Sequence, residues 1–67
     1  MSSAILKGQW KKLRGEIKER WGELTDDDLD QVEGEWDKFV GLLQEKYGYT
    51  KEKADAKIAD LLAGEEE

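Results

Sequence analysis

The 67-residue chain contains no cysteine, no histidine and no proline. Without cysteine and histidine it has no disulfide, no zinc site of the usual kind and no Cys or His nucleophile or base. It also lacks a signal peptide and any run of about 20 apolar residues, so we expect a cytoplasmic protein with no membrane span. Its length predicts a single domain over residues 1–67, with a core that supplies only a few kcal/mol of net stability.

Charged residues are plentiful, at 42% of the chain, and their distribution is uneven. Residues 1–22 carry six basic and two acidic side chains, whereas residues 23–37 carry eight acidic side chains and no basic one. The net charge of the whole chain is −6. Opposite charges in adjacent segments predict ion pairs within the molecule, and binding of an external anion by the basic segment is the alternative.

Apolar residues recur every three or four positions, which is the period of amphipathic helices. We predict four helices, over about residues 4–21, 26–33 and 34–47 and from Thr50 to Gly64. No segment alternates apolar and polar residues for more than a few positions, so strands are not expected. The predicted core consists of Leu6, Trp10, Leu13, Ile17, Trp21, Leu29, Val32, Phe39, Val40, Leu43, Tyr47, Ile58, Leu61 and Leu62.

Polar residues that favour helix starts stand before the predicted helices. Ser3 and Thr50 are placed as N-caps of the first and last helix. Thr25 and Asp28 have the spacing of a capping box, in which each side chain accepts a hydrogen bond from the backbone N–H of the other residue. The predicted stops are Gly22, Gly48 and Gly64, the first two in the left-handed conformation. Residues 3–64 are expected to be ordered and residues 65–67 to form a frayed acidic tail.

An internal repeat relates residues that are 26 positions apart. Gly8, Trp10, Lys12, Gly15, Glu19 and Gly22 recur as Gly34, Trp36, Lys38, Gly41, Glu45 and Gly48. Each copy is followed by a predicted helix that begins after a threonine. The repeat therefore predicts an approximate internal duplication, in which two helical hairpins pack together and cover each other's apolar stripe.

Three glycines, Gly8, Gly15 and Gly41, fall inside predicted helices, where each costs about 1 kcal/mol relative to alanine. Gly8 and Gly15 lie on the face nearly opposite the apolar stripe of the first helix. Such a column of glycines either admits a partner backbone or a ligand at close range or leaves the helix weak and adaptable, and both interpretations remain open.

A set of residues spread over about residues 8–58 resembles a known family. The matching positions are Trp10, Gly15, Lys18, Glu19, Gly22, Leu24, Thr25, Asp26, Asp27, Gly34, Asp37, Val40, Gly41, Tyr47, Gly48 and Tyr49. This pattern, and above all its Gly-x-Leu-Thr-Asp-Asp element, resembles the CsbD-like family of small bacterial stress-response proteins. The resemblance implies an all-α four-helix bundle of two roughly orthogonal helical hairpins, similar to the SAM-like fold, in a cytoplasmic protein that general stress induces.

The resemblance implies no enzymatic activity and no cofactor, and the composition is consistent with this because so small a core can hardly enclose a dry catalytic cleft. We therefore predict a non-enzymatic stress-response protein that acts through its surface, on another protein or by self-association, with no small-molecule substrate. In the family the position of Trp36 is usually basic, and an exposed tryptophan would mark an interaction surface. The predicted contact residues are Lys11, Arg14, Trp36, Lys51 and Lys53.

Nucleic-acid binding is the main alternative. The turn before Lys51 and Lys53 in the second hairpin, together with Lys11 and Arg14 of the basic first helix, could contact phosphates. The acidic run at residues 26–28 and the net negative charge oppose this interpretation. A basic helix lying on a membrane surface and a largely disordered, water-retaining chain are further alternatives, which the apolar stripes and the helix caps disfavour.

The acidic run is also a candidate metal site. Asp26, Asp28 and Asp30 match positions 1, 3 and 5 of a calcium loop, but position 6 is Gln31 instead of glycine and position 12 is Asp37 instead of glutamate. Carboxylates in the first turn of a helix are stabilised by the helix dipole without any metal. We therefore expect no metal site.

Overall fold

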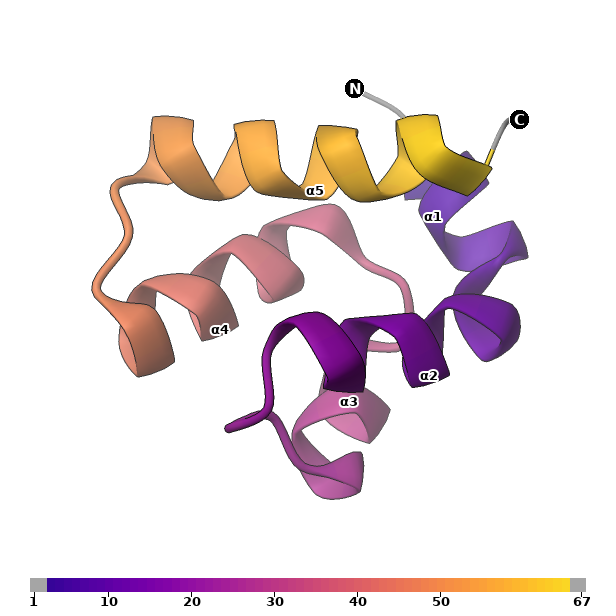
Figure 1. The fold of residues 1–67 in the computed structure, drawn as a ribbon, viewed down its shortest axis with the longest axis horizontal. Helices are drawn as coiled ribbons and strands as arrows, with labels where there is room; N and C mark the ends of the chain where they lie inside the picture. The colour runs from indigo at the N-terminus through magenta and orange to yellow at the C-terminus, as the bar shows by residue number, and fades with distance from the viewer. Residues whose placement is uncertain (1–2, 66–67) are drawn as a thin grey trace.

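The computed structural model describes residues 3–65 and contains only helices and their connections in that range. The all-α prediction is confirmed, but five helices are present instead of four. They are α1 (Ser3–Gly8), α2 (Trp10–Arg20), α3 (Asp26–Val32), α4 (Trp36–Tyr47) and α5 (Lys51–Glu65). α5 runs along one side of the molecule, α4 packs against both α5 and α3, and α2 lies beside α3 (Figure 1).

The predicted first helix over residues 4–21 is wrong in one respect, because it is divided at Gln9. Gln9 has φ −108° and ψ 8°, outside the helical range, and the chain changes direction there between α1 and α2 (Figure 1). Gly8, which disfavours helix, directly precedes the break. The bend allows Leu6 of α1 and Trp10 of α2 both to be buried in the same core.

The predicted caps of the later helices are confirmed. Thr25 Oγ1 accepts a hydrogen bond of 3.1 Å from the Asp28 N–H, and Asp28 Oδ2 accepts one of 3.0 Å from the Thr25 N–H. Thr50 Oγ1 accepts a hydrogen bond of 3.0 Å from the N–H of Lys53. The side chain of Ser3 lies outside the described part of the structure. Local side-chain chemistry thus determines where α3 and α5 begin.

The predicted helix stops are confirmed at Gly48 and, in position only, at Gly22. Gly48 ends α4 with φ 67°. Gly22 follows the C-cap residue of α2, Trp21, as predicted, but it is not left-handed; the N–H of Trp21, which has φ −126°, bonds to the Ile17 carbonyl. Gly64 does not end α5, which continues to Glu65. Residues 66–67, the remainder of the predicted tail, lie outside the described residues.

One hydrophobic core joins all five helices. Its buried members are Leu6, Trp10, Leu13, Ile17, Trp21, Leu24, Leu29, Val32, Trp36, Phe39, Val40, Leu43, Ala54, Ile58, Leu61 and Leu62. Phe39 of α4 lies against two tryptophans of the N-terminal half, with ring centroids 5.7 Å from Trp10 and 5.6 Å from Trp21, both edge to face. This aromatic cluster connects the first and second halves of the chain.

Core burial corrects two predictions about aromatic residues. Trp36 is only 7% exposed, and its Nε1 donates a hydrogen bond of 2.9 Å to Asp55 Oδ1. It is therefore a core residue that joins α4 to α5 and is not available as an exposed contact residue. Tyr47, predicted to be in the core, is only half-buried and stacks on Tyr49 with ring centroids 5.7 Å apart.

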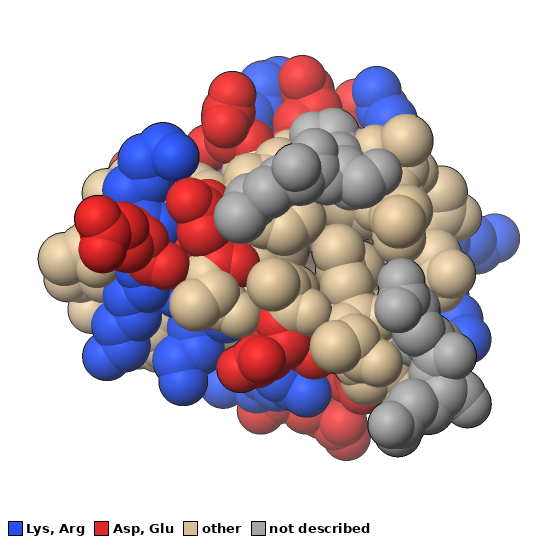
Figure 2. All heavy atoms as spheres, turned by 90° about the horizontal axis from the view of Figure 1, so that it is seen from above, with Lys and Arg blue, Asp and Glu red and all other residues tan. Residues whose placement is uncertain are grey.

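The surface over α5 carries charges of both signs around an uncharged centre (Figure 2). Within residues 3–65 no helix has the length and the apolar character needed to cross a bilayer. Among residues 4–64, no charged or polar residue is buried.

Candidate functional site

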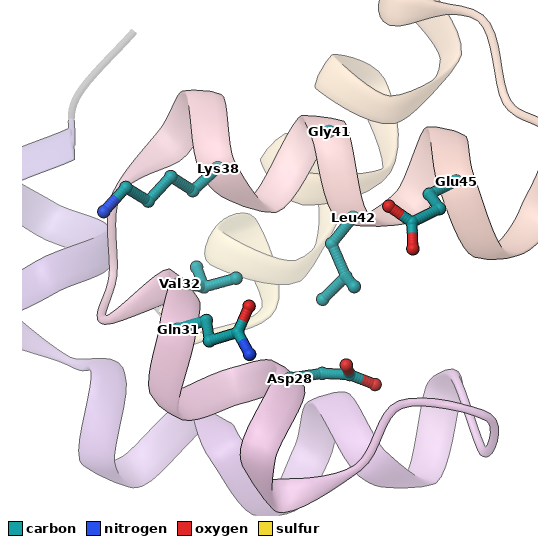
Figure 3. Close-up of a pocket in the computed structure, with 7 residues that line it drawn as sticks. All are labelled: Asp28, Gln31, Val32, Lys38, Gly41, Leu42 and Glu45. Atoms are coloured by element: carbon teal, nitrogen blue, oxygen red, sulfur yellow. The ribbon is translucent and has the colours of Figure 1, made fainter.

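A groove of about 570 Å³ lies between α3 and α4. α3 contributes one wall and the exposed side of α4 the other, as Figure 3 shows. The residues that line it are Asp28, Gln31, Val32, Lys38, Gly41, Leu42 and Glu45. Its volume lies in the range of ligand-binding clefts, and its open shape suits a protein segment better than an enclosed small molecule.

Two apolar side chains lie at the floor of the groove among polar ones, and the α4 wall exposes its backbone at Gly41. Val32 is buried, and the half-buried Leu42 packs against the core and points into the groove (Figure 3). A Cβ atom at Gly41 would meet no other atom within 4 Å. Packing within the described chain therefore does not require a glycine here, although glycine weakens the middle of α4 by about 1 kcal/mol relative to alanine. A glycine at such a place allows the close approach of another molecule.

The two ends of the groove carry opposite charges. Lys38 lies at one end and Asp28 and Glu45 at the other (Figure 3). Lys38 Nζ pairs with Glu35 at 2.9 Å, and the hydrogen bond between them raises the pKa of Lys38 and lowers the pKa of Glu35. Asp28 is held by its capping box, whose hydrogen bond from the Thr25 backbone lowers the pKa of Asp28. The groove is therefore suited to an occupant with charges of opposite sign at its two ends.

Arg14, one of the predicted contact residues, is engaged within the molecule. Its guanidinium pairs with Asp30 at 2.6 Å and lies 3.6 Å from Asp26, and the hydrogen bond to Asp30 raises the pKa of Arg14. Lys18 pairs with the same Asp26 at 2.7 Å. These contacts confirm the prediction of ion pairs between the basic and the acidic segment, and they join α2 to α3.

The other predicted contact residues are exposed. Lys11 lies on α2, and Lys51 and Lys53 lie in the first turn of α5. Lys51 Nζ pairs with Asp55 at 3.3 Å, and Lys53 Nζ lies 4.9 Å from the centre of the Tyr49 ring. Both lysines of α5 thus have a partner on or next to their own helix, whereas Arg14 pairs with α3.

The acidic run is distributed among several partners. Asp26 and Asp30 face α2, whereas Asp28 caps α3. Among residues 3–65, no three acidic side chains are arranged to hold a metal ion.

Sequence reasoning did not identify the groove. Two signals were present: Gly41 is an unexplained glycine inside a predicted helix, and Leu42 is an apolar residue beside the predicted stripe of that helix. Neither signal names the opposite wall, because Gln31 and Val32 of α3 meet α4 only in the folded chain.

Comparisons with known proteins agree with the sequence pattern. A family model described as CsbD-like matches residues 4–56. A UPF0337 protein of Pseudomonas aeruginosa is 53% identical over 61 residues, which cover 91% of this chain and 94% of that protein. The UPF0337 protein YjbJ of Escherichia coli is 49% identical over 53 residues, which cover 79% of this chain and 77% of that protein.

A further UPF0337 protein, from Rhodopseudomonas palustris, is 56% identical over 55 residues, which cover 82% of this chain and 83% of that protein. No solved structure matches this chain. The names of these relatives state no activity. The family model matches most of the chain, and relatives about half identical to it align over most of their own length, so this chain belongs to the CsbD-like family.

Proposed function

We propose that this chain is a cytoplasmic, non-enzymatic stress-response protein that acts by binding a helical protein segment in the groove between α3 and α4. The observation that carries the proposal is the pair of apolar side chains at the floor of the groove, beside the exposed backbone of Gly41. Helical segments bind such grooves by inserting apolar side chains while their backbone approaches a wall of small residues. The stress-response role is drawn from the family resemblance.

The absence of an enzymatic role is supported by the causes of the shifted pKa values. Catalytic acids and bases are usually partly buried groups in a cleft. Asp28 and Asp55 are partly buried, and Asp28 lines the groove, but the causes of the lowered pKa values are an ion pair at Asp26, a helix cap at Asp28 and a hydrogen bond from a tryptophan N–H at Asp55. Their shifts have structural causes and need no substrate.

Nucleic-acid binding receives less support from the same contacts. A phosphate at the start of α5 would compete with Asp55 for Lys51 and with the Tyr49 ring for Lys53. The Lys53 N–H is already bonded to Thr50. Arg14 would have to leave two carboxylates of α3. A gel shift that weakens with salt would restore this alternative.

The proposal is tested by complementation of a strain that lacks the gene, under a panel of stresses. Gly41→Gln places a long uncharged side chain at the wall of the groove. Gly15→Gln is the matched control, because Gly15 is also an exposed helix glycine with no atom within 4 Å of a Cβ atom, and it does not line the groove. We expect Gly15→Gln to restore survival and Gly41→Gln to fail. Equal survival with both variants would contradict a role for the groove.

We also infer that the chain is built from two related hairpins, α2 with α3 and α4 with α5. α2 and α4 both begin with a buried tryptophan, Trp10 and Trp36. The second helix of each pair begins after a threonine whose side chain caps it, Thr25 or Thr50. These shared features support the two-hairpin bundle and the duplication that the 26-residue repeat predicts.

A further inference from the structure

We propose that the occupant of the groove is the outer face of α5 from a second copy of this chain, lying antiparallel to α4. This inference rests on the proposed binding role of the groove and names its partner. The protein then associates with itself: the groove between α3 and α4 of one copy binds the outer face of α5 of the next copy.

The outer face of α5 has the shape that the groove requires. Ala56, Ala59 and Ala63 are all exposed, whereas Ala54 and Ile58 of the same helix are buried. At 100° per residue the three exposed alanines fall within about 60° of one another, opposite the buried side. Figure 2 looks onto this side of the molecule and shows uncharged surface among the charged side chains. Small side chains let this helix approach the backbone at Gly41 closely.

Charge spacing on the two helices determines the direction of docking. Lys38 and Glu45 stand seven residues apart on α4, and Lys53 and Asp60 stand seven residues apart on α5, each about 10.5 Å along the helix axis. In the antiparallel arrangement Lys53 meets Glu45 and Asp60 meets Lys38. In the parallel arrangement each charge would meet a like charge, which is repulsive.

The same antiparallel register brings together two further pairs of residues. It places Ala56 over Leu42 on the floor of the groove, next to Gly41. It also places Glu52 toward Lys46, so another charged residue of the α5 face meets an opposite charge. Lys38, Lys46 and Lys53 already have neighbours, Glu35, Asp28 and the Tyr49 ring, but all three lysines are exposed and can extend toward a second molecule.

The two contacting surfaces differ, so the contact is heterologous and can continue from copy to copy. The contact surface is small and its charged pairs are exposed, so we expect weak association that depends on concentration and on salt. The fraction of assembled protein would therefore rise with the concentration of this protein in the cell.

Sedimentation velocity of the full chain, from micromolar to millimolar concentration, tests the inference. We expect the wild type to associate with rising concentration. Glu45→Lys and Lys53→Glu should each lower the association constant by about tenfold, because each replaces an attraction by a repulsion. Glu19→Lys and Lys11→Glu are the matched controls on α2, with the same changes in net charge at exposed positions, and should change it less than about twofold.

A mixture of the two single variants gives the decisive result. Each variant retains one intact surface, and the reversed surface of each complements the reversed surface of the other. An equimolar mixture should therefore associate as strongly as the wild type, although each variant alone is mainly monomeric. A folding defect would not be repaired by mixing, and circular dichroism of each variant checks the fold independently.

The inference is overturned if the wild type is monomeric at every concentration, if the mixture fails to associate, or if the α2 controls lose association equally. These outcomes are distinct from failure of the proposed function. A monomeric protein in which Gly41→Gln still abolishes complementation would mean that the groove binds a different protein. Association that responds as expected while Gly41→Gln still complements would mean that self-association occurs without serving the stress function.

Discussion

Gly34 and Gly15 differ in structural role, although both were singled out by the 26-residue repeat. Gly34 has φ 79°, and a Cβ atom there would lie 2.6 Å from the Cα atom of Lys7, so its lack of a side chain lets the α3–α4 connection pack against α1. Gly15 lies inside α2 with a helical backbone and no atom within 4 Å of a Cβ atom. Only the first is required by the fold.

Alanine substitutions separate these two roles. Gly34→Ala should lower the free energy of unfolding by about 1–3 kcal/mol, because of left-handed strain and the contact with Lys7. Gly15→Ala should raise it by about 0.5–1 kcal/mol through helix propensity. Urea unfolding followed by circular dichroism measures both changes. A loss of stability at Gly15 would mean that the residue has a role in packing that the structure does not contain.

Trp10 and Trp21 have similar packing but different hydrogen bonding, so substitutions at the two positions can be compared. Both rings lie edge to face on Phe39, but Trp21 Nε1 donates a hydrogen bond to the Tyr49 hydroxyl at 3.3 Å, whereas Trp10 Nε1 is buried without a partner. We expect Trp21→Phe to cost about 1 kcal/mol more than Trp10→Phe, because only the former loses a hydrogen bond. Chemical unfolding of the two variants tests this, and equal losses would contradict it.

At the scale of helices, three carboxylates act as structural acceptors. One caps the start of a helix, and the other two connect neighbouring helices. A hydrogen bond from the Thr25 backbone lowers the pKa of Asp28, one from Lys18 lowers the pKa of Asp26, and one from Trp36 lowers the pKa of Asp55. In each case the folded pKa lies below the ordinary value of 3.8. Their contribution to stability is therefore fully present above about pH 4 and is lost as the pH falls through the folded pKa values.

The free energy of unfolding should accordingly be flat near neutral pH and fall below about pH 4. Asp55→Asn should flatten this fall, because the amide cannot titrate while its oxygen can still accept the Trp36 N–H. Urea unfolding of wild type and variant at a series of acidic pH values measures the slope. Identical slopes would show that Asp55 does not contribute to the acid sensitivity.

Helix boundaries were predictable from the sequence where a single residue sets them, through a capping hydrogen bond or a left-handed backbone. The capping box at Thr25, the cap at Thr50 and the left-handed Gly48 are local hydrogen-bonding and backbone effects, which the residues carry with them. The break at Gln9 was not predictable, because the apolar period continues through it without interruption. It arises where α1 must bend for Leu6 to reach the same core as Trp10.

At the scale of the whole molecule, stability depends on the cluster of Phe39 with the two tryptophans. Phe39 is fully buried and is the ring on which Trp10 and Trp21 converge. Removing it by Phe39→Ala costs roughly 3–5 kcal/mol, which is comparable to what the core of so small a domain supplies. We therefore expect the variant to lose cooperative unfolding and the dispersion of its NMR spectrum.

Leu42→Ala is the control for this prediction. Leu42 is half-buried at the floor of the groove, so its truncation should leave the fold intact and lower stability by a smaller amount. A well-dispersed NMR spectrum of Phe39→Ala would contradict the central place of the aromatic cluster.

The sequence by itself determined the helical class, the caps and most of the core, because helix period and capping act over three or four residues. It also predicted ion pairs between the basic first segment and the acidic segment through the strong charge contrast between neighbours, but it assigned Arg14 to an external contact, whereas Arg14 pairs with Asp30. Tertiary structure alone decided that Trp36 is buried against Asp55, that the first helix bends, and that Leu42 lies with Val32 in a groove whose lining includes Gly41. These features depend on how helices distant in the chain cross one another, and no local pattern of side chains specifies that geometry.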